Sequence, residues 1–127
     1  MSCRLYEDEI WRLALDIIKG LIVLQSKNIM HRDIKAANVL LSNGRAKLAD
    51  LNVCKITKTD YAYSQAGTPY YTSPEIWREE PYSYKSDVWS LGCLLYELCC
   101  LKQPFRTNYG MRDLAEKVQK GKYDPLP

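Results

Sequence analysis

The chain has 127 residues, the length of one ordinary domain, and its composition of 46% hydrophobic and 26% charged residues is typical of a globular protein. Its 18 basic and 15 acidic residues leave a net charge of +3 without a dense basic run, so the composition does not favour nucleic acid as a partner. No apolar stretch is long enough to span a membrane and no signal-peptide pattern opens the chain, so we expect a cytoplasmic protein without a membrane partner. The five cysteines lack metal-ligand spacing, so we expect them to be reduced thiols.

The first predicted element is a helix over residues 7–25. Acidic side chains fill its first turn, where a helix favours negative charge. Apolar side chains recur at helical spacing, at Ile10, Leu13, Ala14, Ile17, Leu21 and Leu24. This pattern predicts that one face of the helix is buried.

The next predicted element is a β-hairpin over residues 39–49. Its centre is Asn43-Gly44, the strongest short-range hairpin signal, because both central positions of such a turn need positive φ. If these two residues form the whole loop, Ser42 pairs with Arg45 and the rest of the register follows.

The open end of this hairpin gathers polar side chains. With a two-residue loop Asn38 faces Ala49, next to Asp50, and with a three-residue loop Asn38 faces Asp50 directly. Asp33 is only five residues upstream of Asn38 and can return to the same place. One amide and two carboxylates form a plausible site for Mg²⁺, which binds few carboxylates together with water and substrate phosphates. The alternative is that Asn38 and Asp50 only cap turns, as these residue types often do.

Three further segments complete the chain. Residues 51–84 are polar and contain one glycine and three prolines, which predicts a long ordered loop of functional importance. Residues 87–101 are apolar nearly all round, which predicts a helix buried on every side. Residues 111–120 predict a shorter amphipathic helix.

Several motifs along the chain resemble those of the protein kinase superfamily. HRDIKAAN at residues 31–38 matches the catalytic loop, and Asp-Leu-Asn at 50–52 stands where the family has Asp-Phe-Gly. Ser-Pro-Glu at 73–75 stands for Ala-Pro-Glu, and SDVWSLG at 86–92 matches the start of the central helix. The segments GTPYYTSPE, YSYKSDVWSLGCLLYELCCLKQPF and KGKYDPLP are similar to the NIMA-related Ser/Thr kinases.

The resemblance implies an α+β, mainly helical fold, the C-terminal lobe of a kinase without its N-terminal lobe. Residues 1–127 then form a partial kinase domain, with the activation segment at 50–75 and the central helix at 87–101. It further implies ATP and Mg²⁺ as cofactors and a protein with a Ser or Thr acceptor as the substrate. NIMA-related kinases act in the cell cycle and in cilia, so the cytoskeleton or a cilium is the expected place of action.

The same resemblance assigns roles to single residues. Asp33 accepts the proton of the substrate hydroxyl, and Lys35 holds the γ-phosphate. The other implied roles are binding of ATP and Mg²⁺ by Asn38 and Asp50, an adenine floor at Leu40, and a bridge from Thr68 to Asp33 and Lys35. Arg32 is expected to pair with a phosphate on the activation segment, with Ser64 as the candidate phosphosite, and Asp87 to brace the catalytic loop from below.

Some kinase features are not found in these 127 residues. No Gly-rich loop and no Val-Ala-Ile-Lys strand precede His31, so we expect the isolated chain to be weakly active or inactive. Asn52 replaces the usual glycine, and Glu75 is expected to lack its arginine partner. Two alternatives to a catalytic lobe therefore stay open. One is a pseudokinase-like module that binds substrates or a complete kinase, and the other is a non-functional truncated gene product.

Overall fold

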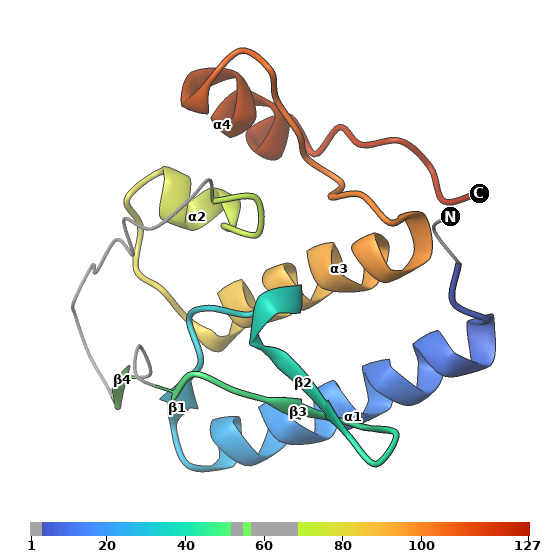
Figure 1. Cartoon of the computed structure of the whole chain (residues 1–127). Helices are drawn as coiled ribbons and strands as arrows, with labels where there is room; N and C mark the ends of the chain where they lie inside the picture. The colour runs from blue at the N-terminus through green and yellow to red at the C-terminus, as the bar shows by residue number, and fades with distance from the viewer. Residues whose placement is uncertain (1–3, 52–54, 57–68) are drawn as a thin grey trace.

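The computed structural model describes residues 4–51, 55–56 and 69–127. Its longest elements are two helices that lie side by side, α1 (Glu7–Ser26) and α3 (Tyr84–Cys100), as Figure 1 shows. The β2–β3 hairpin packs against α1, and the short α2 (Pro74–Trp77) contacts α4 (Met111–Lys120). The remaining elements are β1 (Ile29–Met30), η1 (Ala36–Asn38), β2 (Val39–Ser42), β3 (Arg45–Leu48) and β4 (Lys55–Ile56). The described residues thus form the α+β, mainly helical fold that was predicted.

Helix α1 begins and ends for local reasons. The amide of Tyr6 donates a hydrogen bond of 3.0 Å to the carboxylate of Glu9, and the first turn is acidic. Past its end, Asn28 adopts φ of 56°, a left-handed conformation that asparagine tolerates. The buried face carries Leu13, Ala14 and Ile17. The predicted helix over 7–25 is therefore confirmed to within one residue.

The hairpin has the register of a two-residue loop. Its four cross-strand pairs run from Ser42 opposite Arg45 to Val39 opposite Leu48. Asn43 and Gly44 have φ of 51° and 71°, the positive values that this turn requires. The three-residue alternative is wrong.

Helix α3 differs from its prediction in two ways. It begins three residues earlier, at Tyr84, because the Ser83 hydroxyl caps it by accepting a hydrogen bond from the amide of Lys85 at 3.2 Å. It is also not buried on every side, since the side chain of Val88 is 56% exposed. The apolar composition all round the helix was misleading, because one of its faces meets solvent.

The predicted long loop over 51–84 is wrong in part. Residues 55–56 form β4, which pairs antiparallel with β1, and residues 74–77 form α2 with Pro74 at its first turn. Residues 52–54 and 57–68 lie outside the described part of the chain. The predicted helix over 111–120 matches α4, and Gly121 follows it with φ of 61°.

Two groups of buried side chains form the core. The larger lies between α1, the hairpin, the segment that contains Ile34, and α3, and consists of Leu13, Ile17, Ile34, Ala46, Leu91 and Leu94. The smaller joins α3 to α4 and consists of Cys93, Phe105, Leu114 and Val118. No helix within the described residues is long and apolar enough to cross a bilayer.

Asp16 joins α1 to the hairpin and provides a pH-dependent contact. Its carboxylate accepts hydrogen bonds from the Ala46 amide at 3.0 Å and from the Arg45 guanidinium at 2.6 Å. The Ala46 amide, and after it Arg45, lowers the pKa of Asp16 below its usual value of 3.8.

We expect this contact to stabilise the fold at neutral pH and to be lost as the pH falls below 3.8, through the lower pKa of the folded state. Thermal unfolding of the natural chain and of Asp16→Asn should show a gap in Tm that is constant at neutral pH and closes on acidification. Asp8→Asn, at an exposed position of the same helix, is the matched control. A gap that persists in acid would contradict the prediction.

Candidate functional site

The segment 31–38 is held against α3 by the buried carboxylate of Asp87. One carboxylate oxygen accepts the amide of His31 at 2.8 Å, and the other accepts the amide of Arg32 at 2.9 Å. The Tyr82 hydroxyl donates to this second oxygen at 2.5 Å. Asp87 is only 4% exposed, so three donors replace the water that its charge has lost. The predicted brace beneath the segment is confirmed.

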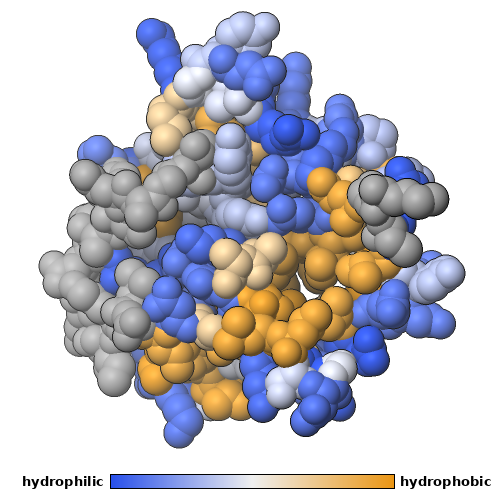
Figure 2. All heavy atoms as spheres, in the orientation of Figure 1, coloured by the Kyte–Doolittle hydropathy of each residue, from blue (hydrophilic) through white to orange (hydrophobic). Residues whose placement is uncertain are grey.

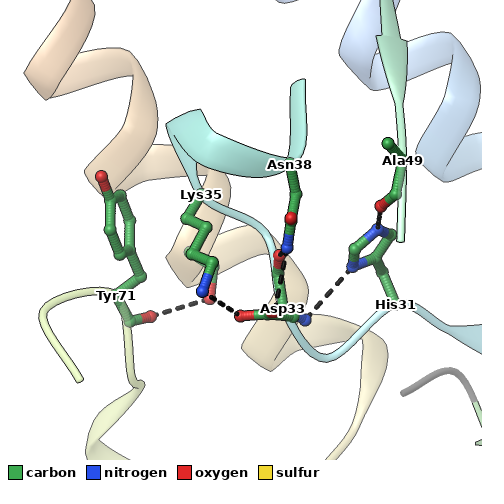
Figure 3. A network of polar contacts seen from close by, with 7 residues as sticks. His31, Asp33, Lys35, Asn38, Ala49 and Tyr71 are labelled. Carbon is green, nitrogen blue, oxygen red and sulfur yellow. Dashed lines mark hydrogen bonds and ion pairs between the residues drawn. The ribbon is translucent and has the colours of Figure 1, made fainter. Parts of the chain in front are cut away.

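Asp33 is the centre of the polar network in this segment. Figure 3 shows the side chains of Lys35, Asn38 and His31 directed toward it. The Asn38 amide donates to the Asp33 carboxylate at 2.9 Å and to the Asp33 carbonyl oxygen at 2.8 Å. The ammonium of Lys35 lies 3.4 Å from the other carboxylate oxygen. Asp33 is thus a carboxylate held in a fixed position with a cation beside it.

His31 joins this segment to the end of the hairpin. Its ring is fully buried, and Nδ1 accepts the amide of Asp33 at 3.2 Å. Because Nδ1 accepts, the proton of the neutral ring lies on Nε2, which donates to the carbonyl oxygen of Ala49 at 2.9 Å. The histidine therefore fixes the backbone of Asp33 relative to the residue that precedes Asp50.

Asn38 pairs with Ala49 at the open end of the hairpin, as expected for a two-residue loop, and Asp50 is the next residue along the chain. The carbonyl oxygen of Asn38 accepts the amide of Ala49 at 2.8 Å, which extends the hairpin register by one pair. Asp50 follows with an exposed side chain and φ of 59°. Arg32 has φ of 72°, so two non-glycine residues of this site have left-handed backbone, a strained conformation that clusters at functional sites.

A family model described as the protein kinase domain matches residues 1–124. The chain belongs to the protein kinase family. It is 44% identical to serine/threonine-protein kinase Nek3 of Mus musculus over 124 residues, which cover 95% of this chain and 24% of that protein. Nek5 of Homo sapiens is also 44% identical over 124 residues, covering 94% of this chain and 17% of that protein.

A third relative is a probable serine/threonine-protein kinase, nek2, of Dictyostelium discoideum. It is 42% identical over 131 residues, or 98% of this chain and 31% of that protein. These relatives confirm the resemblance to NIMA-related Ser/Thr kinases. The kinase chain spans less than a third of the length of these curated relatives.

The donor atoms at the hairpin end fit the Mg²⁺ that the family implies. The Asn38 amide nitrogen donates to two oxygen atoms of Asp33, which orients the amide and leaves its oxygen to bind a cation. Within the described ranges, no three His, Cys, Asp or Glu side chains are arranged to hold a metal ion. Asn38 and Asp50 would supply two ligands of a coordination sphere, in keeping with Mg²⁺ bound together with a nucleotide.

The other predicted site residues have different outcomes. Leu40, the expected adenine floor, lies on β2 opposite Lys47 and is 57% exposed. Thr68 and Ser64, like Asn52, lie outside the described residues. Glu75, which was expected to lack an arginine partner, has a hydroxyl partner, because the Ser86 side chain donates to its carboxylate at 2.6 Å.

Sequence reasoning missed the contacts that join residues 69–75 to α3. The Tyr71 hydroxyl donates to the Glu97 carboxylate, which also accepts the side-chain amide of Gln103 at 3.0 Å. The Ser90 hydroxyl donates to the carbonyl oxygen of Tyr71 at 2.8 Å. Burial and the charge of Glu97 raise the pKa of Tyr71, so its hydroxyl remains a donor. The spacing of Ser90 and Glu97, seven residues apart on one helix face, was the available signal.

Proposed function

We propose that this chain is the catalytic-loop part, the C-terminal lobe, of a NIMA-related Ser/Thr kinase. The proposed reaction transfers the γ-phosphoryl group of ATP to a Ser or Thr hydroxyl of a protein substrate. In the proposed domain, residues 31–38 are the catalytic loop, 50–52 the metal-binding motif and 50–75 the activation segment. The arrangement around Asp33 is the observation that carries the proposal.

The proposed base is Asp33. As the substrate oxygen bonds to the γ-phosphorus, the bond to the β–γ bridging oxygen breaks, ADP leaves, and the hydroxyl proton passes to the Asp33 carboxylate. The Asn38 amide, 2.9 Å away, orients this carboxylate. Lys35, at 3.4 Å from it, is placed to offset the negative charge of the transferred phosphoryl group.

Mg²⁺ supplies charge neutralisation for the phosphates when it is bound. Asn38 and Asp50 are the residues proposed to hold it, and Leu40, exposed on β2, is proposed to lie against the adenine. We propose further that Arg32 receives a phosphate attached to Ser64. Since these 127 residues contain no Gly-rich loop, we expect phosphoryl transfer by the chain alone to be weak or absent.

Calorimetric titration of the purified chain with ATP tests the proposal. We expect binding that requires Mg²⁺ and that weakens by about tenfold in Asn38→Ala, which loses a proposed metal ligand, and in Asp50→Asn, which loses the negative charge of one. Asn108→Ala and Asp8→Asn, both at exposed positions outside the site, are the matched controls. A folded chain that binds no ATP in the presence of Mg²⁺ would contradict the proposal.

A second candidate function is a pseudokinase-like protein-binding module. Figure 2 shows hydrophobic residues gathered on the face formed by α1 and the hairpin. Several large apolar side chains of these elements are more than half exposed, namely Trp11, Leu15, Ile22, Val23, Leu40 and Leu41. Exposed apolar surface of this kind favours contact with another protein, here proposed to be a substrate or a complete kinase. A folded chain that does not bind ATP would favour this candidate. A chain without a cooperative thermal transition would favour a non-functional product.

A further inference from the structure

Tyr82 lies between the catalytic loop and α3 and contacts Arg32 in two ways. Its hydroxyl donates to the Asp87 carboxylate oxygen that also accepts the backbone amide of Arg32, at 2.5 and 2.9 Å respectively. Its ring lies beneath the Arg32 guanidinium, with 5.7 Å from Cζ to the ring centroid. One phenol therefore contacts the side chain of Arg32 directly and its backbone through a shared acceptor.

The Tyr82 ring attracts the Arg32 guanidinium, and the Tyr82 hydroxyl fixes the orientation of the ring. The face of an aromatic ring carries partial negative charge and attracts a guanidinium. The hydroxyl fixes the ring, because a bond to a charged acceptor is stronger than one between neutral groups. Burial first, and then the negative charge of Asp87, raises the pKa of the Tyr82 phenol, so the hydroxyl remains a donor at neutral pH.

We propose that Tyr82 is a positioning residue that fixes both the guanidinium and the backbone of Arg32, and through Arg32 the adjoining Asp33. This inference rests on the proposed function, in which Asp33 is the base and Arg32 the phosphate receptor. It explains how Arg32 keeps its strained φ of 72°, because the amide and the guanidinium of the residue are both held.

A purely structural role for Tyr82 makes a different prediction from a positioning role. If the tyrosine only fills space and satisfies Asp87, its removal destabilises the fold by the same factor whether or not Arg32 is present. If the ring holds the guanidinium, the two side chains are energetically coupled. A double-mutant cycle separates these cases.

The cycle combines Arg32→Met with Tyr82→Phe or Tyr82→Leu in the 127-residue chain, with urea unfolding as the measurement. We expect Arg32→Met to have the same effect in the Tyr82→Phe background as in the natural chain, because phenylalanine keeps the ring. In the Tyr82→Leu background its effect on the unfolding equilibrium constant should be smaller by about two- to fivefold. Tyr84→Leu, two residues away and 47% exposed in the natural chain, should show no coupling.

Additive effects of Tyr82→Leu and Arg32→Met would overturn the proposal. If Tyr82→Leu does not fold, NMR of the natural chain and of Tyr82→Phe decides instead. We expect the side-chain Hε of Arg32 to be shifted upfield by the ring current in both, and an unshifted Hε in the natural chain would equally overturn the proposal. Neither measurement uses ATP, so the two proposals can fail separately. Absence of coupling in a chain that binds ATP would contradict the role of Tyr82 alone. Coupling in a chain that does not bind ATP would contradict the kinase function alone.

Discussion

Replacement of Asp87 by alanine is expected to lower the free energy of unfolding by about 3–5 kcal/mol. The carboxylate accepts the amides of His31 and Arg32 and the hydroxyl of Tyr82. Removal of the carboxylate leaves one buried and two partly buried donors without their acceptor, and each such group costs about 1–3 kcal/mol. A loss of this size is a large part of the stability of a small domain, so we expect much of the variant to be unfolded at room temperature.

Urea unfolding followed by circular dichroism measures this loss. Asp8→Ala, in the exposed first turn of α1, removes the same carboxylate group without a buried donor and should cost less than about 1 kcal/mol. The loss of stability in Asp87→Asn should lie between those of Asp8→Ala and Asp87→Ala, because one side-chain oxygen still accepts while the new NH₂ group faces a donor. If Asp87→Ala unfolds at the urea concentration of the Asp8→Ala control, the carboxylate is not the anchor of the catalytic loop.

The elements that could be predicted from sequence are those with a complete local signal. The hairpin follows from Asn43-Gly44, because the turn fixes the register of every pair. Helices α1 and α4 could be predicted from the helical spacing of their apolar side chains. The strands β1 and β4 could not be predicted, because each has two residues and their pairing spans 25 residues of sequence between Met30 and Lys55.

The site shows the same limit for individual residues. The meeting of Asp33, Asn38 and the hairpin end could be argued from the register alone, because all three lie within one short stretch of chain. The contacts of Tyr82 with Arg32 and of Tyr71 with Glu97 could not, because each joins residues that are far apart in the sequence. Tertiary packing decides which of ten tyrosines bind a buried carboxylate, and no local pattern distinguishes them.

Replacement of His31 by phenylalanine is expected to lower the free energy of unfolding by about 2–4 kcal/mol. The phenyl ring is somewhat larger than the fully buried imidazole, so the substitution leaves no cavity. The loss comes from two partly buried backbone groups that no longer have partners, the amide of Asp33 and the carbonyl oxygen of Ala49.

Thermal or urea unfolding of His31→Phe measures this loss, and Tyr109→Phe, at a side chain that is 85% exposed, is the control with no expected effect. His31→Gln should recover part of the stability, because an amide offers both a donor and an acceptor from a similar position. Since the imidazole joins the Asp33 segment to the residue before Asp50, its loss should also reduce Mg²⁺-dependent ATP binding in the fraction that stays folded. A His31→Phe chain as stable as the natural one would mean that water satisfies both backbone groups, and that His31 does not couple the proposed base to the proposed metal ligand.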